Sequence, residues 1–440
     1  MYREISKLIM YGNMERDCIL YQMGDIFRRF HEGSESDSKL IEDIYTQVKR
    51  ILIVSTDYGF DENLWQCYLA FYLVNDENPF SLTCEKVGAS EGSVNHFAKN
   101  DFEVFRKLFH FDFSEIEKKL GIDCFTYLTD YQAIGKPELM YNQNVSEKII
   151  DLRRKLDEAS DVDEFFDVVT TFYREYGVGM FGLNKAFRLN DNAAGDEIEL
   201  HAINNMDKVV LDDLVGYEIQ KKKLVDNTKA FVQGRKANNV LLYGDSGTGK
   251  STSIKAIVNE FYPDGLRMIE IYKHQFKDLS NIIAKIKNRN YKFIIYMDDL
   301  SFEEFEVEYK FLKAVIEGGV ETRPDNILIY ATSNRRHLIK ETWTDRNDVE
   351  VKNGMHHSDT MEEKLSLVNR FGVTINYSKP SQKEFFNIVV ELARKQGITE
   401  EMYADEELHA EANKWELSHG GISGRTAQQF VNYLLGNIEK

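Results

Sequence analysis

The stretch NNVLLYGDSGTGKST, residues 238–252, decides the fold of this chain. It begins with an apolar run at residues 240–243, which predicts a buried β-strand. Glycines then alternate with small polar residues as far as Lys250 and Ser251, an arrangement in which backbone N–H groups surround a polyphosphate. A helix expected at residues 251–260 would direct the positive end of its dipole toward those phosphates. Strand, glycine-rich turn and helix in this order predict a nucleoside triphosphate site.

Each residue of this loop has an expected role. Lys250 would contact the β- and γ-phosphates, and the hydroxyl of Ser251 would bind Mg²⁺. The expected phosphate-binding residues are Gly244, Asp245, Ser246, Gly247, Thr248, Gly249, Lys250, Ser251 and Thr252. The alternative is a chance glycine turn, which the full pattern between an apolar strand and a helix disfavours.

Length and charge bound the other functions. A chain of 440 residues is too long for one ordinary core and predicts two or three domains. Residues 1–200 contain 22 Lys and Arg against 37 Asp and Glu, a balance of −15, so −3 of the total −18 falls on the remainder. This acidity disfavours a non-specific nucleic-acid clamp, because phosphate contacts need clustered basic residues. A solvated acidic surface is a simpler explanation than an acidic binding face.

The sequence predicts a cytoplasmic protein without membrane association. It contains no 18-residue apolar stretch, and charged residues interrupt its first 17 positions. The four cysteines have no CxxC spacing, so neither a zinc site nor a disulfide framework is expected.

The pattern along the chain predicts three regions. Residues 1–200 are rich in aromatic and acidic residues with mostly helical spacing, as at residues 161–177, and should form a mainly helical, partner-binding region. Residues 201–378 alternate short apolar runs with helical stretches, which is typical of an α/β domain on a parallel sheet. Strands are expected near residues 239–243, 266–271, 293–297, 326–331 and 372–376. Residues 379–440 predict three amphipathic helices that form a lid.

Polar side chains follow two of the expected strands. Asp298 and Asp299 come directly after the apolar run at residues 293–297, and Asn334 follows the next strand. Ligands bind at the carboxyl ends of strands in open α/β sheets, so Asp298 would hold Mg²⁺ through water. Asp299 would orient the attacking water or accept its proton, and Asn334 would help to hold that water. Simple helix capping is the alternative for the two acids.

The order of glycine-rich loop, acidic strand, strand ending in Ser-Asn, Arg-Phe pair and GxSGR helix resembles the AAA+ ATPases over residues 205–440. The segment LDDLVGYEIQKKKL resembles the part of those proteins that surrounds the adenine, which implies that Val215, Gly216 and Tyr217 contact the base. More specifically, five strings in order resemble the bacterial ATP-binding proteins of domain-of-unknown-function family 815: YGDSGTGKS, DDLSFEE, YATSNRRHLI, EEKLSLVNRFG and SGRTAQQF.

The resemblance implies roles for two arginines. Arg370 would be an arginine finger that reaches the ATP of a neighbouring subunit, which implies a homo-oligomer. The alternative is an ion pair with Glu362 or Glu363. Arg425 would report the γ-phosphate to the lid, the alternative being an ordinary residue at a helix N-terminus.

The expected function is ATP hydrolysis with Mg²⁺ that remodels or loads an unidentified protein partner. The wider superfamily has Asp-Glu where this chain has Asp298-Asp299, so the shorter Asp299 predicts slow hydrolysis, with Glu303 or Glu304 as substitutes. The alternatives are a nucleotide-gated adaptor with little turnover and a helicase-loader-like DNA-associated protein. Fold analogy alone supports the last of these, and the net acidity counts against it.

Overall fold

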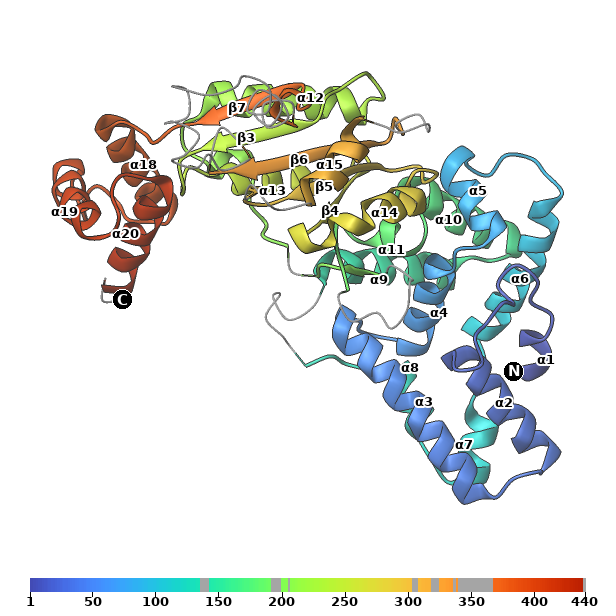
Figure 1. The fold of residues 1–440 in the computed structure, drawn as a ribbon. Coiled ribbons are helices and arrows are strands. Elements are labelled where there is room, and N and C mark those ends of the chain that lie inside the picture. Colours follow the sequence, from blue (N-terminus) through green and yellow to red (C-terminus); the bar gives the residue numbers. More distant parts are fainter. Residues whose placement is uncertain are drawn as a thin grey trace. The chain divides into compact units, whose positions relative to one another are not determined.

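The computed structural model describes residues 1–134, 142–190, 199–204, 206–302, 308–317, 324–334, 338 and 367–437. The chain divides into two compact units, Met1–Asn184 (unit 1) and Lys185–Lys440 (unit 2). Figure 1 shows unit 1 in blue to teal and unit 2 in green to red.

Unit 1 is helical, as predicted. Its helices are α1 (Tyr2–Ile5), α2 (Ile19–Glu32), α3 (Asp37–Tyr58), α4 (Leu64–Asn75), α5 (Pro79–Val87), α6 (Val94–Phe109), α7 (Ser114–Leu120), α8 (Cys124–Thr129), α9 (Gln143–Glu158), α10 (Val162–Glu175) and α11 (Gly179–Leu183). Asp161 caps the N-terminus of α10, and its carboxylate accepts the N–H groups of Asp163 and Glu164 at 2.9 Å each. Its apolar face, including Phe165 and Val169, is buried in one aromatic-rich core. The helical spacing of the sequence thus determines which side faces inward.

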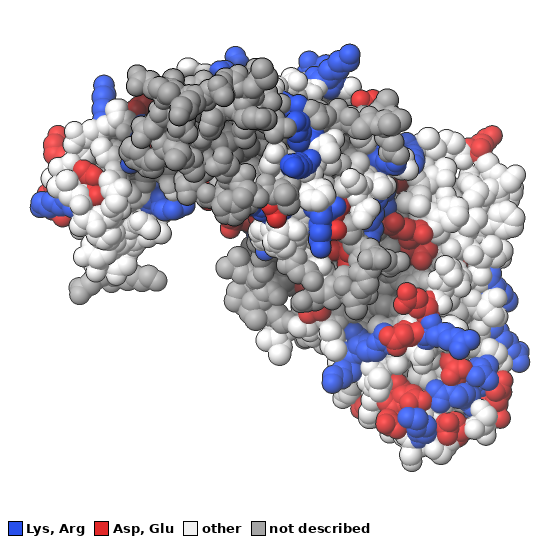
Figure 2. Space-filling model, viewed as in Figure 1, with Lys and Arg blue, Asp and Glu red and all other residues white. Residues whose placement is uncertain are grey.

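The surface of unit 1 is charged with both signs. Figure 2 shows red and blue side chains interleaved over the end where α2 and α3 lie. Arg29 on α2 pairs with Asp25 at 2.9 Å and with Asp43 on α3 at 2.8 Å, and Lys39 pairs with Asp43 at 3.0 Å. Ion pairs that remain partly in contact with solvent contribute little to stability, so we attribute the stability of this unit mainly to its apolar core.

Unit 2 contains a sheet of seven described strands in the order β2-β1-β4-β5-β6-β3-β7. The strands are β1 (Ala186–Leu189), β2 (Leu200–Ala202), β3 (Val240–Gly244), β4 (Leu266–Glu270), β5 (Lys292–Met297), β6 (Ile327–Ser333) and β7 (Val373–Tyr377). All neighbours pair in parallel except β1 and β2. The five strands expected from the sequence are β3 to β7, and they are confirmed to within two residues at each end.

Strands β1 and β2 extend the sheet beyond that expectation. The sequence pattern predicts a boundary near residue 200, whereas the two compact units divide between residues 184 and 185. The difference arises because Ala186 to Arg188 pair with β4, a partner about 80 residues further along the chain. A four-residue strand with a distant partner has too little local pattern to be recognised in the sequence.

Helices cover the sheet and form the lid. Those before the lid are α12 (Glu218–Val232), α13 (Lys250–Phe261), α14 (Leu279–Ile286) and α15 (Glu308–Glu317), with short 3₁₀ turns at η2 (Leu211–Asp213) and η3 (Lys273–Asp278). Apolar residues of α12 and α13 pack with alternate sheet residues in one core. The intervening strand residues, such as Leu241, Ile295 and Ile329, are also buried. Burial on both faces explains why the strands are continuous apolar runs.

The lid consists of α18 (Gln382–Lys395), α19 (Asp405–Ser418) and α20 (Gly424–Asn437), close to the three helices predicted. It has a core of its own, formed by residues such as Phe385, Leu408 and Phe430. Ser381 and Glu384 form a capping box that begins α18, with the Glu384 carboxylate 2.7 Å from the Ser381 nitrogen. In the part of the chain that the structure describes, no helix is both long and apolar enough to cross a membrane.

Candidate functional site

The glycine-rich loop lies between β3 and α13. Gly244, Gly247 and Gly249 have φ angles of 134°, 75° and 91°, a region that favours glycine. A Cβ on Gly244 would lie 2.2 Å from the carbonyl oxygen of Tyr377 on β7, so a side chain is excluded there. Helix α13 begins at Lys250, directly after the loop, as the sequence predicts.

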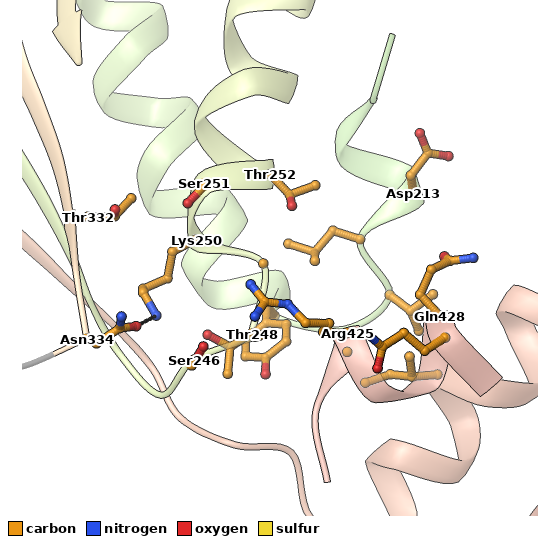
Figure 3. Close-up of a pocket in the computed structure, with 18 of the residues that line it drawn as sticks. Asp213, Ser246, Thr248, Lys250, Ser251, Thr252, Thr332, Asn334, Arg425 and Gln428 are labelled. Atoms are coloured by element: carbon orange, nitrogen blue, oxygen red, sulfur yellow. Dashed lines mark hydrogen bonds between the residues drawn. The ribbon is translucent and has the colours of Figure 1, made fainter. Parts of the chain in front are cut away.

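Lys250 is held at the base of the loop. Its ammonium group donates to the carbonyl oxygens of Gly244 at 3.0 Å and Asp245 at 2.6 Å, and to Oδ1 of Asn334 at 3.1 Å. In Figure 3, Lys250 and Asn334 point toward each other from α13 and from the end of β6. Burial lowers the pKa of Lys250, because a desolvated cation is less stable than a hydrated one. An anion bound beside Lys250 would therefore be stabilised by the positive charge of its ammonium group.

Asp298 stands at the carboxyl end of β5, and its Oδ1 atom accepts hydrogen bonds from three hydroxyl groups. The donors are Ser251 Oγ at 2.7 Å, Tyr296 Oη at 2.7 Å and Thr332 Oγ1 at 2.5 Å. Partial desolvation by the cavity walls opposes ionisation, but these bonds outweigh it and lower the pKa of Asp298. Burial, together with the nearby Asp298 charge, raises the pKa of Tyr296, so the phenol remains a donor.

Asp299 and Asn334 meet beside this carboxylate. Asn334 Nδ2 donates to Asp299 Oδ1 at 2.8 Å, and the backbone N–H of Asp299 donates to Thr332 Oγ1 at 2.9 Å. Asp299 has a φ angle of 49°, which is uncommon for a residue with a side chain. Asn334 therefore links Lys250 to Asp299, and the structure brings together the polar residues predicted at the ends of β5 and β6.

A cavity of about 630 Å³ lies between the loop and the lid. It is lined by Asp213, Leu214, Val215, Tyr217, Ser246, Gly247, Thr248, Gly249, Lys250, Ser251, Thr252, Asp298, Asp299, Thr332, Asn334, Ile388, Leu392, Gly424, Arg425, Gln428 and Gln429. Figure 3 shows Arg425 extending from the lid toward Ser246 and Thr248. The backbone N–H of Arg425 donates to the carbonyl oxygen of Gly247 at 3.1 Å. The lid thus touches the phosphate-binding loop through the main chain.

The segment that we expect to contact the adenine base lies partly in this cavity. Val215 and Tyr217 line it, whereas Gly216, with a φ angle of 81°, turns the chain between them. The Tyr217 ring stacks on Tyr377 with centroids 5.1 Å apart, and its hydroxyl donates to the carbonyl oxygen of Ser378 at 2.9 Å. Burial raises the pKa of Tyr217 to about 12. A neutral aromatic wall of this kind suits a planar base.

Besides Gly216, three predicted residues are not among the described residues that line the cavity. Gly244 is the last residue of β3, where the loop begins. The Oδ2 atom of Asp245 accepts the backbone N–H of Lys379 at 2.8 Å. Arg370 lies in the turn before β7, where its backbone N–H donates to the carbonyl oxygen of Leu367 at 3.3 Å. Its part in a site of a neighbouring subunit remains a prediction. Glu303, Glu304, Glu362 and Glu363 lie outside the described residues.

The sequence did not single out several residues that line the cavity or, like Tyr296, contact a lining residue. Tyr296 and Thr332 resemble ordinary strand residues, although each lies two positions before a predicted site residue, Asp298 or Asn334, on the same side of its strand. Ile388 and Leu392 are spaced by four on α18, as are Gly424 and Gln428 on α20. This spacing places each pair on one helix face. Which face meets the loop depends on how the lid docks, and a local pattern does not contain that information.

The residues present suit a magnesium ion. Ser251 Oγ and the Asp298 carboxylate are hard oxygen donors, which Mg²⁺ prefers, and the serine oxygen keeps lone pairs while its proton is donated. Among the described residues there is no group of three or more His, Cys, Asp or Glu that could hold a metal. The protein would therefore supply few ligands, and nucleotide phosphates and water would supply the others, as is usual for Mg²⁺.

Comparison with known proteins gives one family. The model of the family described as "Protein of unknown function (DUF815)" matches residues 183–438. A curated protein, the replication factor C large subunit of Aeropyrum pernix, is 38% identical over 74 residues, which is 16% of this chain and 15% of that protein. The matched segment is thus a small part of the relative.

Solved structures show weaker similarity. The Holliday junction branch migration motor RuvB of Thermotoga maritima is 16% identical, with 53% of this chain and 74% of that chain covered at a TM-score of 0.31. PCH-2 of C. elegans is 17% identical, with 52% of this chain and 65% of that chain covered at a TM-score of 0.36. Similarity at this level says nothing about what this chain binds.

Proposed function

Because the chain belongs to the DUF815 family and has the sheet, glycine-rich loop and helical lid of an AAA+ ATPase, we propose that it is a Mg²⁺-dependent ATP hydrolase. One observation supports this above all others. Lys250, Ser251, Asp298, Asn334 and Arg425, which come from four separate segments of unit 2, line a single cavity of about 630 Å³. That volume is within the range of ligand pockets.

Each group has a task in phosphoryl transfer, where catalysis is mainly positioning and electrostatics. The backbone N–H groups of residues 246–249 and the Lys250 ammonium bind the phosphates. Ser251 and Asp298 hold Mg²⁺, which neutralises charge on the phosphate oxygens. Asp299 orients the attacking water and accepts its proton, and Asn334 fixes Asp299 through their 2.8 Å hydrogen bond. Arg425 contacts the γ-phosphate from the lid.

Turnover is proposed to be slow. Asp299 has one methylene fewer than the glutamate usual in the superfamily, and it is already bonded to Asn334. The shorter side chain would reach an attacking water less well, and the bond to Asn334 occupies one of its two oxygens. A slow hydrolase suits a remodelling or loading protein whose partner is bound by unit 1.

We further propose that the active form is a homo-oligomer. Arg370 is outside the described lining of its own cavity, and by family resemblance it would reach the cavity of a neighbouring subunit. Light scattering with and without ATP and Mg²⁺, with phosphate release measured on the same samples, tests this proposal. We expect ATP to increase the mass of the particle and phosphate to appear slowly. A monomer that neither binds ATP nor releases phosphate would contradict both parts.

A nucleotide-gated adaptor is the second candidate, and the contact between lid and loop favours it. The Arg425 N–H donates to the Gly247 carbonyl, and through this bond nucleotide binding at the loop would change the position of the lid without any hydrolysis. Asp299→Asn separates the two functions, because it removes a base but keeps the size of the side chain. Partner binding that persists in this variant without phosphate release supports the adaptor, and loss of both supports the hydrolase.

A further inference from the structure

Tyr296 and Thr332 are two hydroxyl residues whose part in the site the family resemblance does not assign. Both residues are buried, each with a relative exposure of 1%, and Thr332 also lines the cavity. Tyr296 lies on β5 and Thr332 on β6, and both donate to the same oxygen of Asp298. Buried hydroxyls are costly unless bonded, so these bonds fix all three side chains together.

The sheet explains why the three groups meet. Tyr296 lies on β5 and Asp298, two residues later, directly follows that strand, so both side chains point to the same side of the sheet. The parallel pairing of Met297 with Ala331 places Thr332 beside Asp298 on the neighbouring strand. The Thr332 oxygen also accepts the Asp299 N–H at 2.9 Å, so one hydroxyl contacts both acids of the site. Its single proton is therefore directed to Asp298.

This geometry restrains the carboxylate. Among the described residues, the hydrogen bonds from Ser251, Tyr296 and Thr332 all end on Oδ1. The rotation of the carboxylate about its Cβ–Cγ bond is thereby set, and Oδ2 is oriented for a further partner. Ser251 lies on α13, whereas Tyr296 and Thr332 lie on strands of the sheet. Asp298 is therefore hydrogen-bonded both from the helix and from the sheet.

We propose that Tyr296 and Thr332 are positioning residues that orient Asp298 toward the magnesium-bound nucleotide. The inference rests on the proposed function, because it assumes that Asp298 helps to hold the metal. Groups that orient metal ligands from outside the ligand shell typically contribute 10- to 100-fold in metal affinity. Removing either hydroxyl should therefore weaken the affinity for Mg²⁺, with little effect on contacts between the loop and the phosphates.

Tyr330 supplies a matched control for Tyr296. It pairs directly with Tyr296 across β5 and β6 and is likewise fully buried. Its hydroxyl forms a hydrogen bond with the Thr228 hydroxyl at 2.8 Å and accepts one from the Asn227 side-chain amide at 3.1 Å. Neither bond involves Asp298. Tyr330→Phe thus removes one buried hydroxyl from the same sheet without touching the site. A difference between the two Phe variants reports the bond to Asp298.

The experiment measures ATP binding by calorimetry, first in EDTA and then over a series of Mg²⁺ concentrations. We expect Tyr296→Phe and Thr332→Val each to raise the Mg²⁺ concentration for half-maximal enhancement of binding about tenfold, with affinity in EDTA unchanged. Thr332→Ser keeps the hydroxyl and should restore wild-type behaviour, and Tyr330→Phe should match the wild type. Thermal unfolding without nucleotide checks that all variants fold.

The outcomes separate this inference from the proposed function. If the wild type binds ATP with Mg²⁺ and Tyr296→Phe responds to Mg²⁺ like Tyr330→Phe, the positioning role is wrong while the function stands. If Thr332→Ser fails to restore the response, the hydroxyl of Thr332 is not the relevant group. If the wild type binds no ATP under any condition, the proposed function itself is contradicted.

Discussion

Two aspartates, one in each unit, accept several hydrogen bonds but from different kinds of donor. Asp101 in unit 1 is fully buried and accepts the backbone N–H groups of Ile9, Met10 and Tyr11 at 2.7 to 3.0 Å. Asp298 in unit 2 faces a cavity and accepts three side-chain hydroxyls. Backbone donors are fixed in place, whereas a hydroxyl can rotate when a ligand arrives. The first arrangement ties a chain segment down, and the second is suited to binding.

The same contrast holds for the arginines. Those of α2 in unit 1 pair with acids of their own surface, as Arg29 does with Asp25 and Asp43. Arg425 in unit 2 instead lines the cavity and contacts the loop through its backbone. Arg29 thus pairs within the folded chain, whereas Arg425 lines a cavity in which we propose that a ligand binds. The following predictions test this distinction, from the largest expected effect to the smallest.

Arg370→Ala tests whether a unit 2 arginine outside the lining of its own cavity acts on a ligand. As an arginine finger it would stabilise charge in the transition state, and its loss should lower kcat about a thousandfold, or about 4 kcal/mol. Phosphate release measures this, with assembly followed by light scattering. Arg235→Ala, at an exposed arginine bonded to Gln233, is the control. Unchanged turnover in Arg370→Ala would place this arginine with the structural ones of unit 1.

Asp101→Ala tests the structural side of the comparison. It leaves three consecutive backbone N–H groups without their acceptor in a buried place, and we expect it to destabilise unit 1 by about 3 to 4 kcal/mol. Denaturant unfolding measures the loss. Glu103→Ala on the same helix, with a side chain 42% exposed, should change stability by less than about 0.5 kcal/mol. A large drop in ATP affinity for folded Asp101→Ala would contradict the separation of roles.

Lys250→Met tests the ligand-binding role that we propose for unit 2. The substitution removes the cation expected at the phosphates and should weaken ATP binding about 30-fold, or about 2 kcal/mol. The stability of the ligand-free protein should not fall, because burial already disfavours this charge and lowers its pKa. Calorimetry and thermal unfolding give the two numbers. If stability fell and affinity did not, Lys250 would be a structural residue like Asp101.

These roles differ in how far the sequence could predict them. The loop residues and Asp298 lie in short patterns whose chemistry is local, and the structure brings Asp298 within 2.7 Å of Ser251 at the end of the loop, while their roles stay predictions. Tyr296 and Thr332 were missed because their contact with Asp298 depends on the register of β5 against β6, which no single segment encodes. Strand β1 was missed for the same reason, since its partner β4 is distant in sequence. In unit 1 the spacing predicted helices, but the Asp101 contact joins segments about 90 residues apart.

We expect Asp76→Asn to have the smallest effect on stability, and that effect should depend on pH. Burial raises the pKa of Asp76, so its ionised form costs stability in unit 1. The cost begins as the pH rises above the ordinary value of 3.8 and is complete above the raised pKa. We therefore expect Asp76→Asn to raise the Tm at pH 7 by a few degrees at most, and to have no effect below pH 3.8.

Asp25 provides the control of opposite sign for this measurement. Partial burial opposes ionisation of Asp25, but hydrogen bonds from Arg28 and Arg29 outweigh it and lower its pKa. The carboxylate thus contributes stability above its ordinary pKa, and that contribution disappears as the pH falls through the lowered value. Asp25→Asn should therefore lower the Tm slightly at pH 7, whereas Asp76→Asn raises it. Equal slopes of Tm against pH in the two variants would show that neither carboxylate is tuned by the contacts described for unit 1.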